Sequence, residues 1–348
     1  MSDHFKAVII VVLSGLIWSF GPLVVKNMID PQIYQLPYLV IRGLTVAIII
    51  ATYLILIEQK DFFMNVIKID KVSVIGGLSL TTAMVGFIYS ISNTTAAVTL
   101  FMLALMPFLA SLIALVFINE KISKQNFITM IIAFIGALIM IYASAFSGSL
   151  YGLIMGFISS LGFAAFTVAL RSKSNFKKFY ILIYAGIFCA AISAFLMVFN
   201  DQEIYLPLRN VLLSMTHGLI VATGLILFSI GSKQLLSGEL TMLSLLEVVG
   251  GIFWAWLPIL GINETPDINT IIGGIIICLA IAMNSYRFEK NRLQNAVNLL
   301  RKGVDKIVDK IADGDKEQTE ILKAFRMFAN SRGWLRRMEA DIDQGLSA

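Results

Sequence analysis

The sequence is poor in charge for its length. Only 14% of its 348 residues are Asp, Glu, Lys or Arg, whereas 58% are hydrophobic, and typical soluble domains carry about 25% charged residues. Of the 49 charged residues, 22 lie in residues 289–348, which leaves the first 288 residues about 9% charged. A water-soluble globule cannot cover its surface with so little charge. Despite a pI near 9.1, the composition excludes a soluble enzyme and a nucleic-acid-binding protein, and it indicates a polytopic membrane protein.

Cysteine and histidine are nearly absent as well. Cys189 and Cys278 lie inside apolar runs, which does not suit a secreted disulfide framework. His4 and His217 are too few for a multi-histidine metal site. The sequence also lacks a P-loop and the common hydrolase motifs. We therefore expect no enzyme activity, no cofactor, no metal and no built-in ATP motor, so that any transport would be driven by a gradient.

Long apolar runs, by contrast, follow one another through most of the chain. A bilayer crossing takes about 20 mostly apolar residues. Ten stretches meet this requirement, at residues 7–25, 37–57, 73–92, 96–118, 127–145, 150–170, 179–199, 211–231, 240–261 and 268–287. The sequence thus predicts an all-α polytopic membrane protein with ten transmembrane helices.

Basic residues in the short loops predict the orientation of these helices. With the N-terminus inside, the inside loops hold eleven Lys and Arg residues and the outside loops hold two. Cytoplasmic loops of membrane proteins carry such an excess of positive charge. We expect a multi-pass protein of the bacterial inner membrane with both termini in the cytoplasm, because an odd number of spans would place the basic tail outside.

The two halves of the chain resemble each other. Residues 1–145 and 146–288 hold five spans each, and Ile118-Asn119-Glu120 recurs as Ile262-Asn263-Glu264. Because five is odd, two such repeats sit in opposite orientations, as in secondary transporters whose site lies near the membrane midplane. The alternative is that any ten-span protein can be divided into two fives.

A family resemblance rests on motifs in both halves. The first half has Gly15-Leu16-Ile17-Trp18, Arg42 in the second span, and the segment 93–101 followed by Pro107 and Asn119-Glu120. The second half has segments 245–249 and 254–256, followed by segment 261–266. Over residues 8–287 this pattern resembles the EamA-type transporters of the drug/metabolite transporter superfamily. The resemblance implies alternating-access transport of small metabolites, such as amino acids or amphipathic organic ions.

Glu247 is the sharpest candidate for a functional residue, because it is the only acid deep within an apolar span. A carboxylate at mid-membrane costs several kcal/mol and normally faces a cavity or a partner. Helical spacing predicts that Ser244, Glu247 and Trp254 share one face. We expect Glu247 to bind a proton or a substrate amine; the alternative is that it ties two helices together by a hydrogen bond.

Other polar and aromatic residues in the spans are candidates for substrate contact. Arg42 could attract an anionic group, pair with Glu247 or snorkel to the headgroups. An aromatic such as Trp18 could stack on a substrate or simply pack. Tyr89, Asn93 and Thr94 could equally bond to a neighbouring helix. The predicted substrate-binding set comprises Trp18, Arg42, Tyr89, Asn93, Thr94, Ser244, Glu247 and Trp254.

The charged tail, residues 289–348, contains amphipathic helical patterns. Leu293, Val297 and Leu300 begin a short heptad seam. The tail could pair with a second copy in a homodimer, lie on the membrane surface or fold back on the spans. The whole sequence predicts a secondary-active transporter, with a small-molecule substrate and the lipid bilayer as partners and no nucleic acid. The alternative is a membrane anchor or assembly protein that transports nothing and acts through its tail.

Overall fold

The computed structural model describes residues 3–68, 70–141, 149–172, 178–202, 205–257, 268–269 and 271–283. The chain divides into two units, Met1–Ser285 and Tyr286–Ala348, and all described residues belong to the first. The predicted tail helices, the repeated segment at 262–264 and Pro258 lie outside the described residues.

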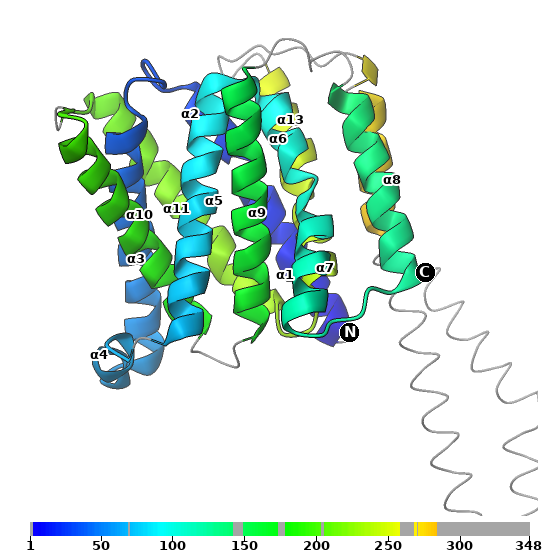
Figure 1. The fold of residues 1–348 in the computed structure, drawn as a ribbon, viewed down its shortest axis with the longest axis horizontal. Coiled ribbons are helices and arrows are strands. Elements are labelled where there is room, and N and C mark those ends of the chain that lie inside the picture. The colour runs from blue at the N-terminus through cyan, green and yellow to red at the C-terminus, as the bar shows by residue number, and fades with distance from the viewer. Residues whose placement is uncertain are drawn as a thin grey trace, which may run out of the picture. The chain divides into compact units, whose positions relative to one another are not determined.

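Every regular element among these residues is a helix (Figure 1). The labelled helices are α1 Asp3–Trp18, α2 Gly21–Lys26, α3 Gln35–Glu58, α4 Asp61–Val66, α5 Lys71–Asn93, α6 Ala96–Leu103, α7 Met106–Phe117, α8 Lys124–Ile141, α9 Leu150–Ser172, α10 Phe179–Phe199, α11 Leu208–Gly231, α12 Ser237–Ser244 and α13 Leu246–Trp256. A further helix covers Ile271–Met283.

Seven helical segments are long and apolar enough to cross a membrane, judged by length and composition. They are Asp3–Lys26, Gln35–Glu58, Lys71–Asn93, Ala96–Phe117, Leu150–Ser172, Phe179–Phe199 and Leu208–Gly231. Two more apolar helices, Asn126–Ile139 and Ile271–Met283, are shorter. The predicted helical membrane class is confirmed, whereas the count of ten spans stays a prediction.

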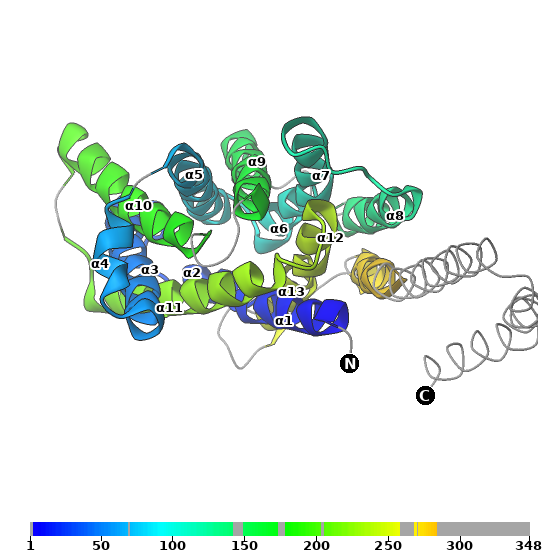
Figure 2. The ribbon, with the colours of Figure 1, turned by 90° about the horizontal axis from the view of Figure 1, so that it is seen from below.

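The helices of the first unit pack in two facing rows. Viewed from below, α10, α5, α9 and α7 follow one another in one row, and α3, α11 and α1 form the other (Figure 2). The rows meet where α10 packs on α3 and where α12 packs on both α7 and α1. Segments far apart in the chain therefore line the space between the rows.

Close helix crossings depend on glycine. A Cβ added to Gly43 of α3 would lie 2.7 Å from the carbonyl oxygen of Gly186 of α10. A Cβ added to Gly186 would likewise lie 2.8 Å from the carbonyl oxygen of Gly43. Real Cβ atoms do not approach that closely, so the two backbones touch only because both residues lack side chains. Small residues at membrane helix crossings permit this approach.

Besides the first span, which is divided into α1 and α2, two helical segments are interrupted in the middle. Helix α6 begins at Ala96, where the Thr95 hydroxyl accepts a hydrogen bond from the Val98 amide, and α7 restarts at Met106. Pro107 stands in the first turn of α7, where its missing N–H costs nothing. The interruption therefore lies just before Pro107, a residue of the first-half motif. Helices α12 and α13 are interrupted at Leu245, without a proline.

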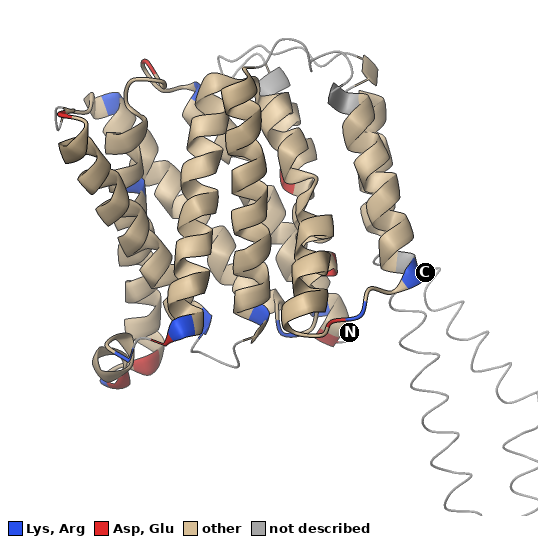
Figure 3. Cartoon of the chain, in the orientation of Figure 1, with Lys and Arg blue, Asp and Glu red and all other residues tan. Residues whose placement is uncertain are grey.

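Charged residues gather at the ends of the helices. Lys and Arg are concentrated at the lower end of the first unit, where the N-terminus lies (Figure 3). We call this the N-terminal end of the bundle. Its turns follow α3, α7, α9 and α11, which are the loops assigned to the inside from the sequence.

Candidate functional site

A cavity lies between the two rows of helices, with about 540 Å³ of empty space that includes space open to solvent. Most of its wall is apolar, and its residues come from α1, α3, α5, α7, α9, α11 and α13 together with Leu103 at the end of α6. Its polar lining side chains are Trp18, Arg42, Ser159, His217 and Glu247.

Arg42 enters the cavity from α3. The residue is only 4% exposed, so it does not snorkel to the headgroups. Its Nη1 donates to the Met84 carbonyl oxygen at 3.2 Å. Its Nε is buried and has no hydrogen-bond partner among the described residues. Because an arginine carries five N–H donors, this guanidinium keeps unused donors beside the cavity.

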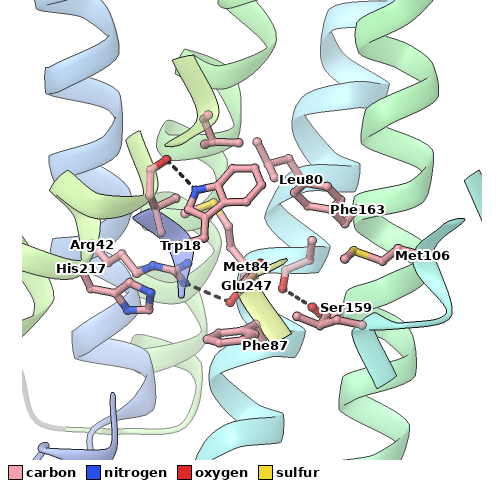
Figure 4. Close-up of a pocket in the computed structure, with 14 residues that line it drawn as sticks. Trp18, Arg42, Leu80, Met84, Phe87, Met106, Ser159, Phe163, His217 and Glu247 are labelled. Atoms are coloured by element: carbon pink, nitrogen blue, oxygen red, sulfur yellow. Dashed lines mark hydrogen bonds between the residues drawn. The ribbon is translucent and has the colours of Figure 1, made fainter. Parts of the chain in front are cut away.

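Glu247 enters the cavity from the first turn of α13. A negative charge is favoured near a helix N-terminus, where backbone N–H groups are unpaired. Among the described residues, Glu247 makes no ion pair within 4.0 Å. The predicted pairing of Glu247 with Arg42 is therefore not formed as a direct contact, although both side chains face the same space (Figure 4).

His217 lies beside Arg42 on the same side of the cavity (Figure 4). It is 2% exposed, and its Nδ1 is 2.9 Å from the hydroxyl oxygen of Tyr38, which is fully buried. A Cβ at Gly21 would lie 3.1 Å from the His217 Nε2. The imidazole is thus fixed on one edge by a hydrogen bond and on the other by close packing.

The apolar wall centres on Trp18. Its indole N–H donates to the Val221 carbonyl oxygen at 3.3 Å, and its ring packs edge-on against Phe163 at 5.5 Å between centroids. A Cβ added to Gly224 would lie 2.1 Å from the Trp18 Nε1. The indole therefore occupies its position because residue 224 has no side chain.

Three of the predicted substrate-binding residues lie away from the cavity lining, and two of them, Tyr89 and Thr94, contact a neighbouring helix. The amide of Asn93 donates to the Tyr89 carbonyl oxygen at 2.7 Å, and Tyr89 packs edge-on against Tyr151. The Thr94 hydroxyl lies 3.0 Å from that of Thr99. Hydrogen bonds to a neighbouring segment were the alternative that the sequence left open for these residues.

The stripe predicted from Ser244 to Trp254 is interrupted by the break at Leu245. Ser244 ends α12, is fully buried and donates to the Thr241 carbonyl oxygen at 2.7 Å. Trp254 stacks on Phe20 at 4.4 Å between centroids. Neither Ser244 nor Trp254 lines the cavity. The break separates Ser244 from Glu247, whereas Trp254 shares α13 with Glu247 but donates its indole N–H to the Ser19 hydroxyl at 2.8 Å. Of the predicted set, the cavity brings together Trp18, Arg42 and Glu247.

Sequence reasoning missed His217 and Ser159. The argument that selected Glu247 could also have identified His217, since an ionisable residue inside a span is uncommon. Ser159 carried no signal, because serine is common on packed membrane helices. Its hydroxyl donates to the Ala83 carbonyl oxygen at 2.9 Å. No group of three or more His, Cys, Asp or Glu residues that could hold a metal ion occurs among the described residues.

Comparison with known proteins connects this arrangement to transporters. Residues 5–142 match the EamA-like transporter family, and residues 276–348 match the N-terminal domain of PEP-utilising enzymes. Two pseudopaline exporters named CntI, from two strains of Pseudomonas aeruginosa, are 25% and 24% identical over 203 residues, which is 57% of this chain and 68% of each exporter. One solved crystal structure has a TM-score of 0.63 and 16% identity, and the match covers 80% of this chain and 96% of that one. That last likeness concerns the fold alone.

Proposed function

We propose that this chain, whose residues 5–142 form an EamA-like transporter domain, is a secondary-active transporter for a small dipolar organic solute. It binds the solute in the cavity between the helix rows and exposes it alternately to the two sides of the membrane. Trp18, Arg42 and Glu247 contact the solute, together with His217.

The observation that carries this proposal is a cation and an anion in one apolar cavity without direct contact between them. Arg42 retains an unpaired buried N–H, and leaving such a donor unsatisfied costs about 1–3 kcal/mol. A carboxylate at membrane depth is also costly. Bound solute would offset both costs if its anionic group met Arg42 and its cationic group met Glu247. The apolar wall at Trp18 and Phe163 would receive the body of the solute.

The packing of the helices supports alternating access. If α1–α8 and the helices from α9 onward are two repeats, large helix contacts have counterparts. Helix α5 packs on α9 as α11 packs on α1, and α10 packs on α5 as α3 packs on α11. Each half also contains a broken helix whose second piece begins at the cavity, at Met106 and at Glu247. Broken helices at the site between inverted repeats are typical of secondary transporters.

The remaining assignments extend the proposal. Residues 1–145 and 146–288 act as the two repeats, and residues 289–348 form a cytoplasmic tail that could also join two copies. Basic residues at the N-terminal end favour an inner-membrane protein with both termini in the cytoplasm. Glu247 couples transport to protons by releasing one when the solute amine binds. The related pseudopaline exporters make export the direction to test first.

A thermal-shift screen on the purified protein tests the proposal. The probes share one apolar body and differ in charge: dipolar, cationic only, anionic only and neutral. A ligand that binds the native state raises the melting temperature by mass action. We expect the dipolar probe to give the largest shift and Glu247→Gln to remove most of it. Equal shifts for the dipolar and neutral probes, or none with any dipolar solute, would contradict the proposal.

A further inference from the structure

Two contacts between an acidic and a basic side chain join the two halves of the chain at the N-terminal end, one partly buried and one fully buried. The first pair comprises Glu120, just after α7, and Arg171 near the end of α9. The Arg171 Nε donates to the Glu120 Oε1 at 2.5 Å, and the side chains are 17% and 14% exposed. The second oxygen of Glu120 accepts from the Ser237 amide at 2.9 Å. Glu120 therefore ties α7 to both α9 and the start of α12.

The chain turns back at Asn119 to make this contact possible. Asn119 has φ 55°, in the left-handed region that asparagine tolerates better than most residues. The Glu120 amide then donates to the Ala114 carbonyl oxygen at 3.1 Å. Arg171 continues the network on its other side, where it donates to the carbonyl oxygens of Ser232, at 2.6 Å, and of Leu235. The turn between α11 and α12 is thus held to both halves.

The second pair is deeper. The His4 Nε2 of α1 lies 3.0 Å from the Glu239 Oε1 of α12, and the side chains are 2% and 0% exposed. The other oxygen of Glu239 is buried without a hydrogen-bond partner among the described residues. Neither residue lines the cavity, and neither has a role in the proposed binding of solute.

An aromatic layer connects these pairs to the cavity. Trp18 and Phe163 line the cavity, and both pack on Phe228, at 5.4 Å and 5.3 Å between centroids. Phe166, one turn further along α9 toward Arg171, stacks on Phe228 and is fully buried. Through Phe163 and Phe166 on α9, the aromatic packing therefore continues from the cavity toward Arg171.

At the opposite end, hydrogen bonds between side chains and backbone groups join neighbouring segments. There, the Lys26 Nζ donates to the Thr94 carbonyl oxygen, and Asn210 exchanges two hydrogen bonds with the backbone of Ile29. Within the described part of the chain, the ion pairs that join the first half to the second are Glu120–Arg171 and His4–Glu239.

We propose that Glu120–Arg171 and His4–Glu239 are the gate that closes the cavity toward the N-terminal end. They must separate together when α1 and α7 move away from α9 and α12. This role rests on the proposed function, because a gate needs a solute cavity to close. In this proposal, Glu120 and Glu239 control the opening of the cavity and do not contact the solute. Buried partners that lose a pairing charge are strongly destabilised, so the pairs favour the closed state over a half-open one.

Thiol labelling tests the gate without any knowledge of the solute. The reporter is Ala83→Cys on the cavity wall, labelled in oriented vesicles by a membrane-impermeant maleimide from one side at a time. The rate for the same protein without the reporter is subtracted, to remove the native cysteines. We expect Glu120→Gln combined with Glu239→Gln to raise labelling from the N-terminal side about ten-fold and to lower it from the other side.

A matched control comes from the same end of α1. Lys6 and Asp3 form an ion pair at 3.6 Å, but their side chains are 55% and 76% exposed and belong to one helix. Asp3→Asn should change labelling less than two-fold. Unchanged labelling of the gate variant from the N-terminal side would overturn the proposal. Equal increases from both sides would also overturn it, because they would indicate general loosening.

Cross-linking gives a second test in case the charge variants fold poorly. His4→Cys and Glu239→Cys are joined by a short bifunctional thiol reagent, which holds the gate closed. Labelling of Ala83→Cys from the N-terminal side should then fall to background, and solute flux should stop until the cross-link is cleaved. Full flux through the cross-linked protein would contradict the gate. If no solute is transported by any form, the labelling result alone still decides about the gate.

Discussion

The broken helices α6–α7 and α12–α13 have similar backbones but bring different chemistry to the cavity. The first piece of each has eight residues, and the second begins after one or two intervening residues. At the restart the first half places Met106 in the cavity wall, and the second half places Glu247 there. The break has the same structural effect in both halves, whereas only the break in the second half places a charged residue in the cavity wall.

This difference separates two tasks of the broken helices, which are motion and recognition of the solute. Both breaks give the unit two bending points beside the cavity, which suits a rocking motion. Glu247 adds an anion at the N-terminal turn of α13, where the helix dipole favours it. Motion therefore depends on both halves, and recognition of a cationic group depends on the second half. The predictions below alter one side of this comparison at a time, from the largest expected effect to the smallest.

Removing the charge at the restart of α13 should have the largest effect. We expect Glu247→Gln to weaken binding of a dipolar solute about 100-fold, which corresponds to about 2.8 kcal/mol. Met106→Gln changes the corresponding position of the first half and should weaken binding by about three-fold at most. Isothermal titration measures the solute affinity of both variants. Similar losses of affinity in the two variants would contradict the distinction between the halves.

Arg42 supplies the opposite charge from α3. We expect Arg42→Gln to weaken binding of dipolar and anionic probes about ten-fold and to leave a purely cationic probe within two-fold. Arg209→Gln is the matched control, because Arg209 contacts Asn27 at 3.4 Å at an exposed position. The thermal-shift series with the four probes reads out this selectivity. A uniform loss for all four probes would assign Arg42 a structural role only.

Glycine at position 224 should matter through Trp18. Gly224→Ala would push its Cβ into the indole, so we expect dipolar solute binding to fall about three- to ten-fold. Gly274→Ala is a suitable control, because the nearest atom to its added Cβ is the Val249 Cγ1 at 3.9 Å. Tryptophan fluorescence and titration follow the two variants. Unchanged binding in Gly224→Ala would show that the position of Trp18 does not set the fit.

The smallest expected effect concerns a lysine outside the spans. Burial, with the nearby charges of Lys233 and Arg171, lowers the pKa of Lys178 to about 8, whereas an unfolded lysine titrates near 10.4. Between these values the unfolded chain binds more protons, so stability rises with pH. Compared with Lys178→Met, the wild type should gain about 2–4 °C in melting temperature between pH 7.5 and 9.5. The prediction would be refuted if the melting temperatures of the wild type and Lys178→Met changed by the same amount between pH 7.5 and 9.5.

Much of the fold could be predicted because membrane spans have a simple physical requirement. Apolar length alone located the helices, and Pro107 indicated the first break. The break at Leu245 was not predictable, since no proline or turn residue stands there. That break separates Ser244, at the end of α12, from Glu247 in α13.

The charged residues of the candidate site could be predicted, because such residues are rare inside membrane spans. Glu247 and Arg42 stood out because charges inside spans are scarce, and both line the cavity. The polar residues Tyr89, Asn93 and Thr94 satisfy one another or nearby backbone groups, which sequence spacing cannot distinguish from solute contact. The gate pairs were not predictable, because His4 and Glu239 are 235 residues apart and meet only through the packing of α1 on α12.

Solute counterflow in proteoliposomes tests the central claim most directly. Vesicles with wild-type protein, Glu247→Gln or Asp3→Asn are loaded with the dipolar solute that gives the largest thermal shift, and entry of the labelled solute is followed. Wild type and Asp3→Asn should exchange solute rapidly, and Glu247→Gln should exchange it at least ten-fold more slowly. Equal exchange by wild type and Glu247→Gln would contradict the assignment of the cavity as the transport site.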